Sequence, residues 1–99
     1  MKSVRVTTEN PAQLREDINE KIHLNQIKTW SYDESKYAIA HTGGQYKGHF
    51  HFEYHIDKNK GILEFRLDAY GSEFAESKAV PFLEWMLTKH FGDRIEFIK

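Results

Sequence analysis

The sequence predicts an α+β fold: a two-layer sandwich in which an antiparallel β-meander carries two helices on one face. Three patterns predict this fold. Four consecutive segments between residues 29 and 68 alternate apolar and polar side chains, an amphipathic helix precedes them, and a more apolar helix follows them. Strands with one buried face alternate in this way, and both helices need an apolar sheet surface to cover. The expected element order is β-α-β-β-β-β-α-β within a single compact domain, residues 1–99.

A short strand and a helix open the chain. Val4 and Val6 alternate with polar neighbours, as a strand with one buried face requires. Asn10 fits the N-cap of a helix and Pro11 its first position, because asparagine can accept a bond from a free backbone N–H and proline has no N–H to leave unpaired. The helix is expected to end near residues 23–25. Its apolar stripe recurs every four residues: Leu14, Ile18 and Ile22.

The two longest strand segments, residues 50–56 and 63–67, predict their own pairing. A turn near Asn59-Lys60 that places Phe52 opposite Leu67 keeps the apolar side chains of both segments on one face. The same register places opposite charges across from each other on the other face: His51 and Asp68, Glu53 and Arg66, His55 and Glu64.

The segments at residues 29–32 and 36–40 supply two further strands. Gly43-Gly44 suits a two-residue hairpin turn after the second of them, because both central positions of such a turn favour glycine. This turn predicts that Tyr37 pairs with Phe50 and Ile39 with Gly48, with Tyr37 on the apolar face.

A second helix is predicted between Ser72, a suitable N-cap, and Gly92, a suitable residue just beyond the C-terminal end. Pro81 lies inside the pattern, so the helix either kinks there or restarts with the proline in its first turn. Residues 94–97 predict a final short strand. The predicted core face of the helix contains Phe82, Trp85, Met86 and Lys89, broadened by Leu83, Leu87 and Phe91.

Composition narrows the classes of function. The formal net charge of -1 gives no long-range field that would steer the chain onto nucleic acid or an anionic membrane. The absence of cysteine excludes disulfides, thiolate nucleophiles and cysteine-ligated zinc. No apolar run approaches the roughly 18 residues that a membrane span needs. We therefore expect a cytoplasmic protein with no cofactor and no membrane partner.

Alternate positions on one strand segment gather titratable side chains. With a carboxylate from the neighbouring strand, the candidate metal ligands are His49, His51, Glu53, His55 and Asp68. Imidazole and carboxylate groups can bind zinc or another divalent ion. The same groups also form charge pairs on a solvated sheet face, and a flat open face lacks the supporting shell of a metal site. The expectation is therefore charge pairing without a metal.

Residues 47–54, KGHFHFEY, resemble the RNP1 segment of RNA-recognition motifs, which begins with Lys or Arg and Gly and continues with alternating aromatic residues. In that family two exposed aromatic side chains stack on bases, whereas here those positions hold His49 and His51. Arg5 stands in the first strand where the family has a stacking aromatic residue. The resemblance implies an alternative function, a single-stranded nucleic-acid-binding module that uses the exposed sheet face. The residues that would carry it are Lys36, Lys47, His49, His51 and Arg66.

No catalytic residue is assigned from the sequence. None of the serines lies in a Gly-x-Ser-x-Gly elbow, and Gly43-Gly44 lacks the lysine and the helix start of a phosphate-binding loop. An enzyme is therefore less expected than a binding protein, although a metal-binding or enzymatic domain using the His/Glu strand face stays an alternative.

The favoured interpretation is a small non-enzymatic protein-interaction module, such as a regulatory, inhibitor or immunity-type protein, whose partner is another protein. An exposed sheet face, an edge strand and the loops are the surfaces that such a small domain can offer. Three aromatic residues near the ends of predicted elements are the candidate partner contacts: Tyr46, Tyr70 and Phe74.

Overall fold

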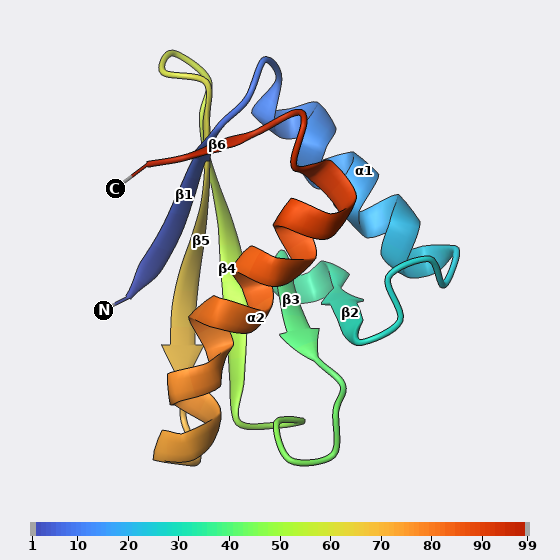
Figure 1. The fold of residues 1–99 in the computed structure, drawn as a ribbon, viewed down its shortest axis with the longest axis vertical. Helices are drawn as coiled ribbons and strands as arrows, with labels where there is room; N and C mark the ends of the chain where they lie inside the picture. The colour runs from blue at the N-terminus through green and yellow to red at the C-terminus, as the bar shows by residue number, and fades with distance from the viewer. Residues whose placement is uncertain (1, 99) are drawn as a thin grey trace.

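One antiparallel sheet and two helices on a single face of it make up the fold of the computed structural model, which describes residues 2–98 (Figure 1). The strands are β1 (Ser3–Thr7), β2 (Trp30–Asp33), β3 (Ala38–His41), β4 (Phe50–Asp57), β5 (Ile62–Ala69) and β6 (Glu96–Phe97). The helices are α1 (Pro11–His23) and α2 (Glu73–Phe91), and a 3-10 turn, η1 (Glu34–Lys36), joins β2 to β3. The predicted α+β class and element order are confirmed.

The strand order in the sheet is β2-β3-β4-β5-β1-β6. The first four of these strands form the predicted meander, since each pairs with the next one along the chain. The sequence did not predict the neighbours of β1 and β6. β1 lies between β5 and β6, with Val4 opposite Phe65 and Val6 opposite Phe97.

The register between β4 and β5 is the predicted one. Phe52 lies opposite Leu67, and the charged pairs follow on the other face, with His51 opposite Asp68 and Glu53 opposite Arg66. Because a shift of one residue would move every apolar side chain of either strand into water, this register is strongly specified.

The predicted register between β3 and β4 is wrong. Ile39 pairs with Phe52 rather than with Gly48, so the connection is an eight-residue loop, residues 42–49, instead of a two-residue turn. Within this loop the Gly43 carbonyl accepts bonds from two later backbone N–H groups, and the residue with a positive φ, +81°, is Gly48. The observed register differs from the predicted one by four residues. Because four is an even number, the apolar side chains of both strands still lie on the same face of the sheet.

Tyr37 was also predicted wrongly, because it belongs to no strand. It ends η1 with a left-handed backbone, φ 49°, and its side chain is 58% exposed. The Arg15 guanidinium of α1 lies 5.8 Å from the centre of its ring. The strand therefore begins one residue later, at Ala38.

α1 forms where the sequence predicts it. The Asn10 side chain accepts the backbone N–H of Gln13 at 3.1 Å, and Pro11 takes the first helical position. Leu14 and Ile18 are fully buried against the sheet, and Ile22 is partly buried at its edge.

α2 is a single helix that continues through Pro81 instead of restarting there. The Ser72 side chain accepts two backbone N–H groups at its start. Gly92 is the C-cap itself, with an ordinary right-handed backbone, so no left-handed glycine ends this helix. The predicted core face is wrong at Trp85, which is 64% exposed, and at Lys89, which is exposed as well. The residues that do pack on the sheet are Ala75, Ala79, Leu83, Met86, Leu87 and Phe91.

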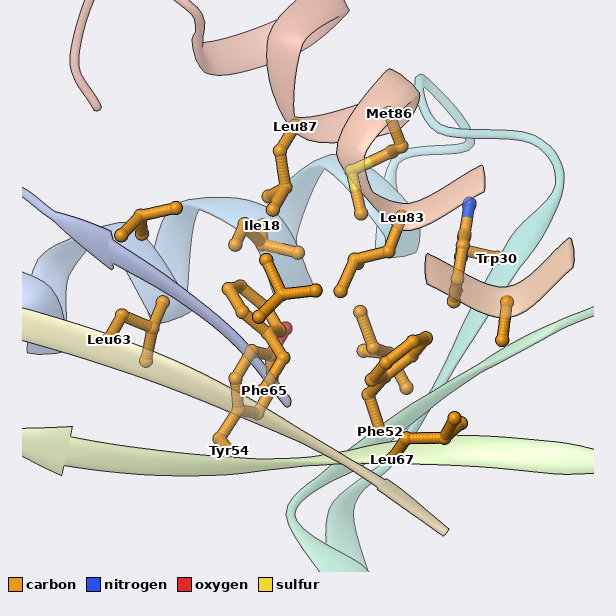
Figure 2. Packing of buried hydrophobic residues seen from close by; sticks show 14 of the residues in the cluster. Ile18, Trp30, Phe52, Tyr54, Leu63, Phe65, Leu67, Leu83, Met86 and Leu87 are labelled. Atoms are coloured by element: carbon orange, nitrogen blue, oxygen red, sulfur yellow. The ribbon is translucent and has the colours of Figure 1, made fainter. Parts of the chain in front are cut away.

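The core fills the space between the helices and the sheet. Figure 2 shows Ile18 of α1 and Leu83, Met86 and Leu87 of α2 directed at Phe52, Tyr54, Phe65 and Leu67 of the strands. Several of these side chains have no exposed surface at all, as close packing requires. With one sheet face thus covered, the surfaces that can meet other molecules are the outer sheet face, the outer sides of the two helices, the edge strands and the loops.

Candidate functional site

His51 lies on the outer face of β4, where solvation was predicted, yet only 9% of the residue is exposed. The Tyr70 ring packs on the imidazole, with 5.5 Å between ring centres, and the Tyr70 hydroxyl lies 3.1 Å from Nδ1. Ala38 and Ala40 of β3 line the same small hollow beside it. The prediction of a solvated face is therefore wrong at His51, because the β5–α2 connection brings Tyr70 over this position.

The other nitrogen of His51 faces two carboxylates. Nε2 lies 3.5 Å from Glu53 Oε1 and 3.6 Å from Asp68 Oδ2. One potential ligand atom from each of these three residues lies within 4.8 Å of those from the other two. The Glu53 and Asp68 side chains are 46% and 58% exposed, so the group is a buried histidine beneath two solvent-accessible acids. A proton on Nε2 can be donated to either acid, and the contact with Asp68 is the cross-strand pair that the register predicts.

The other two predicted metal ligands do not complete the cluster. His49 Nδ1 accepts the backbone N–H of Ser72 at 3.3 Å, so this histidine supports the start of α2. A Cβ at Gly71 would lie 2.0 Å from that nitrogen, and glycine is therefore needed for the close approach. His55 stands at the edge, 3.9 Å from Glu53 and with 39% of its side chain exposed.

The residues of the nucleic-acid alternative lie in different places. Lys36 borders the hollow beside His51, whereas Lys47 lies in the loop after β3. Arg66 Nε donates to Glu64 at 2.8 Å, so its charge is already paired. The carboxylates at positions 53, 64 and 68 share the outer sheet face with Arg66, and a nucleic-acid backbone would meet them there.

Two of the three candidate partner contacts come together. Tyr46, in the loop after β3, stacks on Phe74 at the start of α2, with ring centres 6.1 Å apart and an angle of 19°. Tyr46 also meets Phe82 edge to face at 5.0 Å. Tyr70, the third candidate, lies over His51 instead, and 57% of it is exposed.

Further large side chains extend this aromatic group along α2. Trp85 and Phe74 are 64% and 53% exposed, and lysine ammonium groups lie over both rings, Lys89 over Trp85 at 4.8 Å and Lys78 over Phe74 at 5.7 Å. Spacings of four, seven and four residues place these four side chains on one stripe of the helix. We call the α2 surface the set Tyr46, Phe74, Lys78, Pro81, Phe82, Trp85 and Lys89.

A groove runs beside this stripe, between α2 and the β2–β3 edge of the sheet. Its volume is about 480 Å³, and it is lined by Thr29, Trp30, His41, Pro81, Phe82 and Trp85. Burial lowers the pKa of His41, and its Nδ1 accepts the Gly43 N–H at 2.9 Å. The imidazole is thus held neutral at neutral pH, and the groove is lined by apolar and aromatic groups without a carboxylate.

The sequence contained a signal for this surface that the prediction missed. Phe74, Lys78, Trp85 and Lys89 share one helical stripe, whereas Ala75, Ala79, Leu83 and Met86 share another. The first stripe mixes lysines with aromatic residues and the second is wholly apolar, so the second is the better candidate for burial. Trp85 was assigned to the core because it shares one face of the helix with Phe82 and Met86, a face that the prediction drawn from spacing rotated away from the true one.

No protein-family model, curated protein or solved structure matches this chain. Among residues 2–98, neither helix combines the length and the apolar character needed to cross a membrane.

Proposed function

We propose that this protein is a non-enzymatic protein-interaction module that binds another protein through the α2 surface and its groove. The observation that carries the proposal is the exposure of Trp85 and Phe74 beside Tyr46 and an apolar groove. Aromatic side chains are enriched in protein interfaces and provide many of their energetically dominant contacts. A contiguous exposed apolar patch is also uncommon on a monomer unless it is used for binding.

The arrangement of the rings supports a preformed interface. Tyr46 is held between Phe74, Phe82 and His41, with ring centres 5.0–6.1 Å apart. Because these aromatic side chains are already packed against one another in the free protein, less conformational entropy is lost when a partner binds. A Cβ at Gly43 would lie 2.8 Å from His41 Cε1, so glycine at this position allows the loop to cross the imidazole.

Strand addition, the other binding mode open to such a module, has less support. The two edge strands are β2, four residues long, and β6, two residues long. Edges this short offer few backbone groups to an added strand.

Catalysis also has less support from the geometry. The Ser31 and Ser77 hydroxyls donate to backbone carbonyls, Ser35 donates to the Asp33 carboxylate, and Ser72 caps α2. The groove offers one titratable group, His41, and its Nδ1 is already bonded to the backbone. A hydrolytic site requires a nucleophile within reach of a base and donors for the developing charge, and the lining of the groove includes no such set.

The test is a comparison of three immobilised proteins against a lysate of the source cells: wild type, Trp85→Ala, and Tyr37→Ala. Tyr37 is a matched control because its ring is similarly exposed, 58%, but lies outside the α2 surface. A true partner, identified by mass spectrometry, should be retained by the wild type and by Tyr37→Ala and lost from Trp85→Ala.

The purified partner should then bind Trp85→Ala at least about tenfold more weakly than the wild type by calorimetry, since truncating an interface anchor costs 2 kcal/mol or more. Circular dichroism should show all three proteins folded. If every retained protein binds Trp85→Ala as well as the wild type, the α2 surface is not the binding site and the proposal is wrong.

A further inference from the structure

The distribution of charge around the groove is unequal. The chain has 15 acidic residues and a net charge of -1, yet no acidic residue lies between Glu20 and Asp33 or between Glu34 and Glu53. These two stretches contain β2, β3 and the loop after β3, which form one side of the groove. The carboxylates of the outer sheet face lie on the opposite side of the sheet from the helices.

Two lysines lie against aromatic rings of the α2 surface, and two more adjoin groove or surface residues in sequence. Lys78 and Lys89 belong to the α2 surface, Lys28 precedes the groove residue Thr29, and Lys47 follows Tyr46. Two acidic residues adjoin the stripe in sequence, Glu73 before Phe74 and Glu84 before Trp85, and each is about 100° around the helix from that neighbour.

These lysines are available to a partner. In the described part of the chain, all five ion pairs involve histidine or arginine as the cation, and none involves a lysine. Lys78 and Lys89 lie over aromatic rings instead, an arrangement that positions the ammonium groups without neutralising them.

We propose that the occupant of the α2 surface is an acidic segment of another protein, which inserts one bulky apolar side chain into the groove and places carboxylates near Lys78 and Lys89. This inference rests on the proposed function and names the chemistry of its partner. A neutral, apolar groove rimmed by unpaired ammonium groups is complementary to an apolar anchor flanked by acids. The flanking carboxylates would attract the lysine ammonium groups and orient the segment, and the apolar anchor would contribute most of the buried surface.

Two other polyanions fit the surface less well. The stacking faces that a nucleic-acid base would need are partly covered, because Phe74 stacks on Tyr46 and has Lys78 over its ring, and Lys89 covers Trp85. An anionic membrane favours a protruding apolar face that enters the lipid interface, whereas the groove residue Trp30 is only 4% exposed.

The experiment begins with selection of a random peptide display library on the wild-type protein, followed by fluorescence anisotropy with the enriched peptides at pH 7.5 and near-physiological salt. The enriched sequences should share a bulky apolar residue flanked by Asp or Glu. Replacing those acids with Lys should weaken binding at least about tenfold. The double variant Lys78→Glu/Lys89→Glu should weaken binding of the acidic peptides by a similar factor and bind the Lys-substituted peptides more tightly than the wild type does.

The matched control is Lys58→Glu/Lys60→Glu, which makes the same charge change in the exposed β4–β5 turn, at the end of the sheet away from the loop after β3 (Figure 1). It should leave peptide binding unchanged. Random single-stranded oligonucleotides and vesicles of phosphatidylserine and phosphatidylcholine are tested with the same variants. If either one binds the wild type more tightly than the acidic peptides do and is weakened by Lys78→Glu/Lys89→Glu, the acidic-segment proposal is wrong.

The outcomes separate this inference from the proposed function. If peptide binding is lost in Trp85→Ala but does not change when the peptide acids or the two lysines are substituted, the acidic-segment proposal is wrong and the proposed function is retained. Peptides that bind Trp85→Ala as tightly as the wild type would refute both. A selection that enriches no apolar and acidic pattern also overturns the acidic-segment proposal.

Discussion

Tyr54 provides a test of the core that depends on both pH and packing. Its ring lies between the sheet and α1, 6% of it is exposed, and its hydroxyl donates to Asn19 Oδ1 at 3.0 Å. Burial, with a smaller contribution from nearby Tyr32, raises the Tyr54 pKa well above 10. The folded protein therefore keeps the Tyr54 proton at a pH where the unfolded chain, with a tyrosine pKa of about 10, has released it.

This difference in protonation between the folded and unfolded states determines how the free energy of unfolding changes with pH. Below about pH 10 both states hold the proton, and Tyr54→Phe should cost about 0.5–1.5 kcal/mol for the lost hydrogen bond. Above about pH 10 the folded state binds one more proton than the unfolded state, so the wild type loses about 1.4 kcal/mol of stability per pH unit at this residue. Tyr54→Phe has no such group. The two stability curves should therefore cross between about pH 10 and pH 11, above which the variant is the more stable protein.

Urea unfolding followed by circular dichroism from pH 7 to pH 11.5 measures both curves. The difference between them isolates Tyr54, because every other titrating group is present in both proteins. Tyr37→Phe, the same substitution at an exposed ring, controls for the chemical change itself. A constant difference between the wild type and Tyr54→Phe across the whole pH range would show that Tyr54 titrates equally in both states and is not buried.

Two further predictions concern the other faces of the molecule. Leu83→Ala, at a fully buried side chain, should lower the free energy of unfolding by about 2–5 kcal/mol, whereas Trp85→Ala should lower it by under about 1 kcal/mol; equal losses in urea titrations would place Trp85 in the core after all. Calorimetric titration with zinc at neutral pH should show no stoichiometric site at His51. Among residues 2–98, three donor groups converge there and two of them are on half-exposed side chains, whereas a structural zinc site takes four ligands. A one-to-one site of submicromolar affinity that His51→Ala abolishes would instead establish a metal centre.

Much of the fold could be predicted because its signals are local. The Asn10 cap and the period-two pattern of β4 and β5 depend on nearby residues, and cross-strand charge pairs tested the register independently. The β3–β4 register could not be predicted in the same way. Gly43-Gly44 is a strong turn signal, but the chain uses this segment to pack Tyr46 against α2, a tertiary contact that local propensity does not report.

The surfaces were harder to predict for a related reason. His51 occupies an outer-face position by alternation, and only the path of the β5–α2 connection places Tyr70 over it. Trp85 is large and apolar, and its exposure follows from the rotation of α2, which the small residues Ala75 and Ala79 set by packing on the sheet. Such rotation depends on helix–sheet packing as a whole rather than on any single residue.

The position of β1 has a consequence for folding. β1 comes first among the elements, but its sheet partners come from the second half of the chain, with Val4 opposite Phe65, about 60 residues away. The meander of β2 to β5 needs only short loop closures, whereas docking β1 against β5 closes a loop that spans most of the domain. We expect the meander and its helices to order first and β1 to join late. Until then Val4 and Val6 stay exposed on an unpaired strand, which makes residues 3–7 the segment most open to mispairing and aggregation while the chain folds.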